Sequence, residues 1–316
     1  MTAARRVLAC PASLKGVLAA PAAAAALAEG FLAAGRECDE CPVADGGEGT
    51  AEALASVLGG TWHTARVSDP LGRPVEARWL ELPDGTGVVE SAEPLGLPRV
   101  APEERDPLSA SSRGLGELIL TAGERPLLVC LGGVATVDGG RGLREIVHRL
   151  PRGTRVACDV RSTLLDAARL FARQKGASDD DVVELERRLA ADTELAPYAE
   201  LPGAGAAGGL GAALAAVGGE LVPGAALVLD VVGFAERLAR AGLVVTGEGA
   251  VDRTSLEGKA PAEVGRRTLD AGVRCVVFGG RVDAPLPDVE TVALSGDPSR
   301  AREDLVELGV RLGGAG

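Results

Sequence analysis

Lysine is scarce in this chain, and each lysine stands next to a glycine. Of 33 basic residues only three are lysines, namely Lys15 in SLKG, Lys175 in QKG and Lys259 in EGK. The lysine ammonium is a compact charge that can sit on a phosphate group, whereas arginine binds through a planar fork. Glycine lets the backbone turn sharply beside that charge. The pattern favours three anion-binding lysines, and the alternative is that all three are ordinary surface residues.

Carboxylates beside glycines recur in three segments that follow apolar runs: Asp45 in ADGGEG, Asp138 in VDGG and Glu248 in TGEG. Any one of these segments is also a good turn former. In open α/β sheets ligands bind at the carboxyl ends of the strands, where all three segments are predicted to lie. Glycine N–H groups can contact phosphate oxygens, and a neighbouring carboxylate can hold Mg²⁺ or accept a hydroxyl proton. The three segments therefore indicate phosphoryl-transfer chemistry.

The segment GAGAAG, residues 203–208, matches the glycine fingerprint of dinucleotide-binding folds, and Asp230 lies near the distance expected for a ribose-binding acid. The residues before it contain Pro197 and Pro202 and do not resemble a strand. The glycines can bind an anion at the start of an alanine-rich helix, or they can simply pack closely. A nicotinamide-linked oxidoreductase therefore remains an alternative. No Walker A motif is present, because the Gly258-Lys259 step is followed by alanine.

Composition narrows the class of protein. The chain has 316 residues, of which 46% are hydrophobic and only 2% aromatic, and its formal charge is −12. Few exposed rings and a strong negative charge argue against binding to nucleic acid or to an anionic membrane. The first residues show no signal-peptide pattern, and no apolar run is long enough to span a bilayer, so a cytoplasmic location is expected. The six scattered cysteines are expected to be reduced thiols.

Helix and strand patterns alternate at both ends of the chain. Strands are predicted at 7–10, 38–43 and within 243–249, 274–280 and 291–295, with helices at 19–34, 47–58 and 261–269. Together they predict one five-stranded parallel sheet with helices on both faces. Between them, 61–67, 74–82 and 87–91 are predicted as an antiparallel meander, followed by a helix at 111–122 and strands at 126–131 and 155–160. The expected organisation is a discontinuous α/β domain, residues 1–60 plus 242–316, interrupted by an α+β domain, residues 61–241.

Eight segments resemble the bacterial glycerate kinase family, which is distinct from the P-loop kinases. They occur in the family's order and are PASLKG (11–16), PVADGGEGT (42–50), DPLGRPV (69–75), LGGVATVDGG (131–140), ACDV (157–160), QKGA (174–177), GAGAAGGLG (203–211) and TGEG with a later GKAP (246–261). The resemblance implies a flavodoxin-like domain with an inserted second domain. It also implies ATP- and Mg²⁺-dependent phosphorylation of D-glycerate, commonly to 2-phosphoglycerate. A homodimer is one possible assembly.

The chain departs from the family pattern at several polar positions. The family usually has Asp at Ala12, Ser at Val134, a polar residue at Val137, Arg at Ala250 and Gln at Thr254. These departures leave two alternatives to a glycerate kinase open. One is a kinase for another small hydroxy acid, and the other is a catalytically weakened regulatory relative.

The resemblance and the chemistry together assign roles to individual residues. The catalytic candidates are Asp45, Asp138 and Lys15, with either aspartate as the base. The candidates for binding substrate or phosphate are Ser13, Gly46, Gly47, Gly132, Gly133, Lys175, Gly205, Gly208, Gly209 and Lys259. The candidates for holding Mg²⁺, directly or through water, are Glu248, Asp252 and Asp159. At least two of the three lysines are expected to face one cleft as exposed side chains.

Overall fold

The structure is a computed structural model that describes residues 6–253, 255 and 259–314. Its contacts divide the chain into two compact units. Unit 1 comprises residues 1–45, 52–58 and 225–316, and unit 2 comprises residues 46–51 and 59–224. Both ends of the chain therefore belong to one unit. Residues 225–241, assigned to the insertion from the sequence, belong to unit 1. The domain boundaries expected from the sequence stay a prediction.

Unit 1 contains a five-stranded sheet in which every pairing is parallel. The strand order is β11 (Glu290–Ala293), β10 (Arg274–Val282), β9 (Ala241–Val251), β1 (Arg6–Pro11) and β2 (Cys38–Glu40). Ala9 in β1 lies beside Val245 in β9, so strands from the two ends of the chain form the middle of the sheet. The predicted five-stranded parallel sheet built from both ends of the chain is confirmed.

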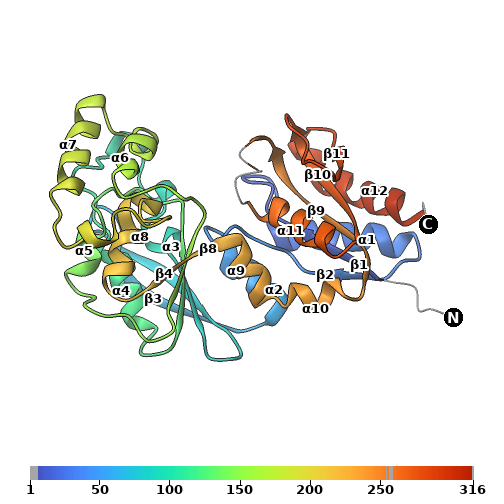
Figure 1. Cartoon of the computed structure of the whole chain (residues 1–316), viewed down its shortest axis with the longest axis horizontal. Helices are drawn as coiled ribbons and strands as arrows, with labels where there is room; N and C mark the ends of the chain where they lie inside the picture. Colours follow the sequence, from blue (N-terminus) through green and yellow to red (C-terminus); the bar gives the residue numbers. More distant parts are fainter. Residues whose placement is uncertain (1–5, 254, 256–258, 315–316) are drawn as a thin grey trace. The chain divides into compact units, whose positions relative to one another are not determined.

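Helices cover both faces of this sheet (Figure 1). Val7 and Ala9 pack into a core with residues of α1 (Ala20–Ala33) and α12 (Ala301–Gly314). The intervening Leu8 and Cys10 point to the opposite face and are also buried. The remaining helices of this unit are α2 (Thr50–Leu58, which begins in unit 2), α9 (Gly224–Val231), α10 (Phe234–Leu238) and α11 (Ala260–Asp270).

Two glycines bring α1 and α12 into close contact. A Cβ on Gly30 would lie 2.1 Å from the carbonyl oxygen of Val306, and one on Gly309 would lie 2.6 Å from the carbonyl oxygen of Leu27. Neither distance is sterically allowed, so the two backbones approach to a separation that only glycine permits. The first and last helices of the chain are thereby packed together.

Unit 2 contains a six-stranded mixed sheet. Its order follows the sequence: β3 (Thr61–Ser68), β4 (Pro74–Glu81), β5 (Gly87–Glu90), β6 (Leu127–Leu131), β7 (Arg155–Cys158) and β8 (Glu220–Pro223). The first two pairings are antiparallel and the last three are parallel. The predicted meander and the next two strands are confirmed. Strand β8 was not predicted, because only Leu221 and Val222 are apolar in this short segment before Pro223.

Helices of unit 2 pack around the mixed sheet and its loops. They are α3 (Ala92–Leu95), α4 (Arg113–Thr121), α5 (Arg141–Arg144), α6 (Asp166–Phe171), α7 (Asp179–Ala190) and α8 (Ala206–Ala216). Short 3₁₀ turns lie at Leu97–Arg99, Pro102–Glu104, Arg173–Lys175 and Ala196–Tyr198, with another in unit 1 at Pro298–Arg300. Among the described residues no helix combines the length and apolar character needed to cross a membrane.

Candidate active-site residues

The loop after β1 carries the first candidates. Ala12 N donates to the carbonyl of Gly247 at 2.8 Å, which holds the start of the loop against β9. The chain then turns at Gly16, whose φ of +76° suits glycine, and both Ser13 and Lys15 are exposed. The ammonium of Lys15 is therefore presented to solvent at the carboxyl end of a central strand.

Asp45 lies at the start of helix α11. Its Oδ1 accepts a hydrogen bond from the backbone N–H of Ala260, the first residue of that helix, where the helix dipole favours negative charge. Burial raises the pKa of the Asp45 carboxyl, while the Ala260 hydrogen bond, Lys259 and Lys15 act in the opposite direction. A partly buried carboxyl thus lies between a helix N-terminus and two lysines.

Glu248 belongs to the same group of side chains. Its carboxylate accepts hydrogen bonds from Ser255 Oγ at 2.7 Å and from Lys259 Nζ at 3.3 Å. Burial raises the pKa of Glu248, and the charge of Asp45 raises it further. Ser255 Oγ also accepts the backbone N–H of Asp252 at 3.1 Å, so one serine links two predicted acidic residues.

The position of Glu248 corrects one expectation. The TGEG segment was predicted as a turn after its strand, but β9 continues to Val251. Glu248 pairs with Gly279 of β10, and Val251 pairs with Val282. A Cβ on Gly247 would lie 2.2 Å from the carbonyl oxygen of Phe278, so glycine here permits close strand packing and does not mark a strand end.

A second group of candidates lies in unit 2 after β6. Ser91 Oγ accepts the N–H of Gly132 and donates to its carbonyl, each at 3.1 Å, which fixes the Gly132–Gly133 turn. Gly47 lies against this turn, and Asp159 Oδ2 would be 3.9 Å from a Cβ on Gly47 and 3.4 Å from one on Gly132. Asp159 itself is exposed. The two glycines therefore leave space beside an exposed carboxylate at the carboxyl ends of β6 and β7.

Gly46 has a packing reason to be glycine. A Cβ there would lie 2.6 Å from Gly224 Cα and 2.7 Å from Ala157 Cβ, and its φ is +87°.

Both carboxylate oxygens of Asp138 accept hydrogen bonds that hold a loop together. Its Oδ2 accepts from Ser112 N at 2.9 Å, Ser112 Oγ at 2.7 Å and Gly142 N at 3.1 Å, while its Oδ1 accepts from Gly140 N at 3.0 Å. These donors come from the starts of α4 and α5. The arrangement is that of a structural carboxylate, with little lone-pair capacity left for a substrate proton.

Lys175 is buried, contrary to the expectation of an exposed cleft lysine. Only 4% of it is exposed, and its Nζ donates to the carbonyl of Thr136 at 2.8 Å. Burial lowers the pKa of Lys175 to about 8, partly offset by the charges of Asp138 and Asp159. Lys175 is therefore buried and bonded to a backbone carbonyl, whereas the charges of Lys15 and Lys259 lower the pKa of Asp45.

Lys175 makes stability depend on pH in a specific direction. Its pKa is about 8 in the folded chain and about 10.4 in the unfolded chain, so between these values the unfolded chain binds more protons. The cost of burying the ammonium is fully present below pH 8 and is lost as the pH rises. Relative to Lys175→Met, wild type should gain about 2 kcal/mol of unfolding free energy between pH 7.5 and 10. Urea unfolding of both proteins at both pH values measures this difference, and parallel pH profiles would contradict it.

The fingerprint glycines are packed against other backbone segments. A Cβ would lie 2.2 Å from Thr163 O at Gly205, 2.1 Å from Thr136 O at Gly208 and 2.9 Å from Gly139 Cα at Gly209. Ala207, Gly208 and Gly209 also have positive φ, so the regular part of α8 starts after them. Close packing explains these glycines, and the dinucleotide interpretation receives no support from them.

Sequence reasoning did not single out three residues that organise these groups. Ser255 binds Glu248, Ser91 fixes the Gly132 turn, and Glu90 accepts the N–H groups of Gly49 and Ala51 at 3.3 and 2.6 Å at the start of α2. Glu90 and Ser91 follow a buried apolar run at the end of β5. This position could have identified both residues from the sequence, because ligands bind at the carboxyl ends of parallel strands.

The acidic candidates do not form a preassembled metal cage. Among the described residues, no group of three or more His, Cys, Asp or Glu side chains is arranged to hold a metal ion. Mg²⁺ bound with a nucleotide commonly uses one or two carboxylates, with phosphate and water supplying its other ligands. The exposed Asp159 beside two glycines and the Glu248–Asp252 group each fit that requirement.

A model of the glycerate kinase family matches residues 7–148 and 145–296. The chain belongs to this family. It is 37% identical to the glycerate 2-kinase of Escherichia coli K12, over 82% of this chain and 81% of that protein. It is 34% identical to the glycerate kinase of Halalkalibacterium halodurans, over 85% of this chain and 84% of the relative. A crystal structure of a provisionally named glycerate kinase 2 from Salmonella typhimurium LT2 has a TM-score of 0.85 and 30% identity, covering 99% of this chain and 98% of that one.

Most departures from the glycerate kinase pattern lie in apolar surroundings. Ala12, Val134 and Val137 are 7%, 3% and 1% exposed, and both valines belong to hydrophobic cores. Ala250 is partly exposed near the end of β9, and Thr254 lies outside the described residues. Both valines therefore pack in hydrophobic cores, at positions where the resemblance implies polar side chains.

Proposed function

We propose that this protein transfers the γ-phosphoryl group of ATP to a hydroxyl of D-glycerate. Membership of the glycerate kinase family gives the reaction class, and the surroundings of Asp45 carry the assignment to this chain. A partly buried carboxyl with a raised pKa, next to two lysines and a helix N-terminus, suits proton removal beside bound anions.

The proposed roles in unit 1 follow from exposure and charge. Asp45 accepts the proton of the attacked hydroxyl, and it is favoured over Asp138 because the oxygens of Asp138 are already hydrogen-bonded. The exposed Lys15 binds a phosphate or the glycerate carboxylate, with Ser13 beside it. Lys259 neutralises phosphate charge and orients Glu248 through their hydrogen bond.

The proposed roles in unit 2 centre on the turn after β6. The backbone N–H of Gly133, with Gly47 beside the turn, binds phosphate oxygens at close approach. The N–H of Gly132 already donates to Ser91 Oγ, so Gly132 contributes the shape of the turn. Lys175 keeps the Thr136 carbonyl in place and so positions the loop that carries Asp138.

Mg²⁺ is part of the proposal. The candidates that would hold it, directly or through water, are Asp159 in unit 2 and the Glu248–Asp252 group in unit 1. The ion would neutralise phosphate charge on the bound nucleotide.

The direct test measures ADP release with ATP and Mg²⁺. We expect release to be at least tenfold faster with D-glycerate than with L-glycerate, lactate or no acceptor, and to stop when Mg²⁺ is chelated. Phosphorus NMR of the product distinguishes 2-phosphoglycerate, which we propose, from the 3-phospho isomer. Equal rates with and without D-glycerate would overturn the assignment, and faster release with another hydroxy acid would redefine the acceptor.

A cytoplasmic location and a homodimer complete the proposal. The composition supports the first, since a chain of charge −12 with few aromatic residues is poorly suited to anionic membranes or nucleic acid. The homodimer is argued below from the surface of unit 1.

A further inference from the structure

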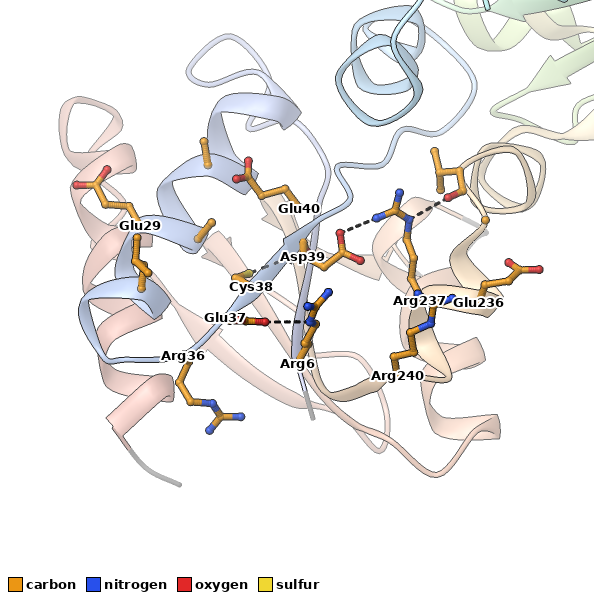
Figure 2. A pocket seen from close by; sticks show the side chains of 15 residues that line it. Arg6, Glu29, Arg36, Glu37, Cys38, Asp39, Glu40, Glu236, Arg237 and Arg240 are labelled. Atoms are coloured by element: carbon orange, nitrogen blue, oxygen red, sulfur yellow. Dashed lines mark hydrogen bonds and ion pairs between the residues drawn. The ribbon is translucent and has the colours of Figure 1, made fainter. Parts of the chain in front are cut away.

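The five-stranded sheet ends at β2, whose outer edge borders a wide groove. Figure 2 shows this groove, which has a volume of about 1000 Å³ and lies between α1, β2 and α10. All of its lining residues belong to unit 1. It lies outside the loops assigned to phosphoryl transfer.

The backbone of β2 has groups available for another strand. Glu37 O and Cys41 N bond to β1 through Val7 N and Ala9 O. Because bonded and unbonded residues alternate in a parallel pair, the N–H and C=O of Cys38 and Glu40 point away from β1. No backbone partner of these groups occurs among the described residues. An edge of this kind accepts an antiparallel strand.

Charges along this edge are mixed in sign. Four arginines and five carboxylates line the groove, in a chain whose overall charge is −12. Arg6 pairs with Glu37, and Arg237 pairs with Asp39. Arg36 and Glu40, which Figure 2 shows toward opposite ends of β2, have no ion-pair partner in the described part of the chain. Protective edge charges are typically of one sign, whereas a self-complementary surface needs both.

An apolar side chain lies on the rim of the same groove. Leu32 on α1 is 73% exposed, and Ala25 and Ala28 line the groove beside it. Covering such a shoulder removes apolar surface from water, which favours association. The groove thus combines an open strand edge, an apolar shoulder and unpaired charges of both signs.

We propose that a second copy of this chain occupies the groove, with β2 pairing antiparallel to the partner's β2 across a two-fold axis. Placing Cys38 on the axis sets Arg36 opposite Glu40 of the partner subunit, and the reciprocal contact forms at the other end. In this register Cys38 exchanges both of its outward hydrogen bonds with the partner's Cys38, and the N–H of Glu40 meets the carbonyl of Arg36 of the partner subunit. The N–H of Arg36 already donates to the carbonyl of Phe31. The two sheets become one. Sliding the partner strand by one residue would oppose outward and inward backbone groups. Sliding it by two residues would set Asp39 opposite Asp39 of the partner subunit, so the charge pairing selects the register centred on Cys38.

Charge reversal tests the interface. Wild type should be dimeric by light scattering coupled to size exclusion. Arg36→Glu and Glu40→Arg should each raise the dimer dissociation constant at least tenfold, because each creates two like-charge contacts. The double variant Arg36→Glu/Glu40→Arg should return the constant to within about threefold of wild type. Unchanged melting temperature and ADP release in the single variants would show that each still folds.

The opposite sheet edge supplies a matched control. Arg274 pairs with Glu290 there at 2.8 Å, with both side chains about half exposed. Arg274→Glu should leave the dimer intact. A monomeric wild type, a dimer insensitive to both β2 reversals, single effects that the double variant does not rescue, or dissociation by Arg274→Glu would each overturn the proposed interface.

Discussion

Asp45→Asn should lower the turnover of glycerate phosphorylation by about 10²- to 10⁴-fold, the range typical of removing a general base. The amide oxygen of asparagine can still accept the hydrogen bond from Ala260 N, so helix α11 keeps its cap and thermal stability should change little. Steady-state ADP release and a melting curve on the same preparation measure both effects. A variant with near-normal turnover would exclude Asp45 as the base.

Asp138→Asn is the matched control for that experiment. The oxygens of Asp138 accept hydrogen bonds from three backbone N–H groups and one hydroxyl, and an asparagine would turn an NH₂ group toward some of them. We expect a loss of about 1–3 kcal/mol in unfolding free energy, with turnover per folded molecule largely retained. The opposite outcome, normal stability with lost turnover, would move the base to Asp138.

Lys15→Met should lower turnover by on the order of a hundredfold or more, because a charge-assisted contact is worth more in a desolvated transition state than in water. Lys15 is exposed, so its removal should leave the melting temperature nearly unchanged. Lys15→Arg should recover only part of the activity, since a planar fork replaces a point charge.

Arg311→Met is the control for the loss of one positive charge. Arg311 is an exposed residue of α12, and its removal changes the net charge of the protein by the same amount. Turnover should remain at the wild-type level. If both variants lost activity equally, net charge would explain the effect and the assignment to Lys15 would fail.

Most strands of the fold could be predicted from the sequence because a short strand that is buried on both faces appears as a continuous apolar run. Val7–Cys10 is continuously apolar and forms a strand covered on both faces, as predicted. Strand β8 left no such mark, since its pairing with β7 depends on a neighbour distant in sequence. The extension of β9 through Glu248 was missed for a similar reason, because glycines that usually signal a turn here allow β10 to approach.

The site was predictable by residue type and less so by environment. Asp45, Glu248 and Lys259 were each candidates from the sequence, but their grouping also depends on β9 continuing past Glu248, which was not predicted. The burial of Lys175 did not follow, because the carbonyl of Thr136 that it binds lies in another loop. The donors that bond to the Asp138 carboxylate lie at the starts of two helices, and the sequence around Asp138 does not predict these contacts.

The pairing of β1 with β9 has a consequence for the order of events during synthesis. Strand β1 is complete at residue 11 and its neighbour β2 follows at residue 38, but β9, its neighbour on the other side, starts at residue 241. At elongation rates of 5–20 residues per second, roughly 10–50 s separate the synthesis of β1 from that of β9. During that interval β1 and helix α1 lack β9 and α12, while unit 2 is synthesised and completed. The nascent chain should therefore bind chaperones through its first forty residues and release them only once the last strands have left the ribosome.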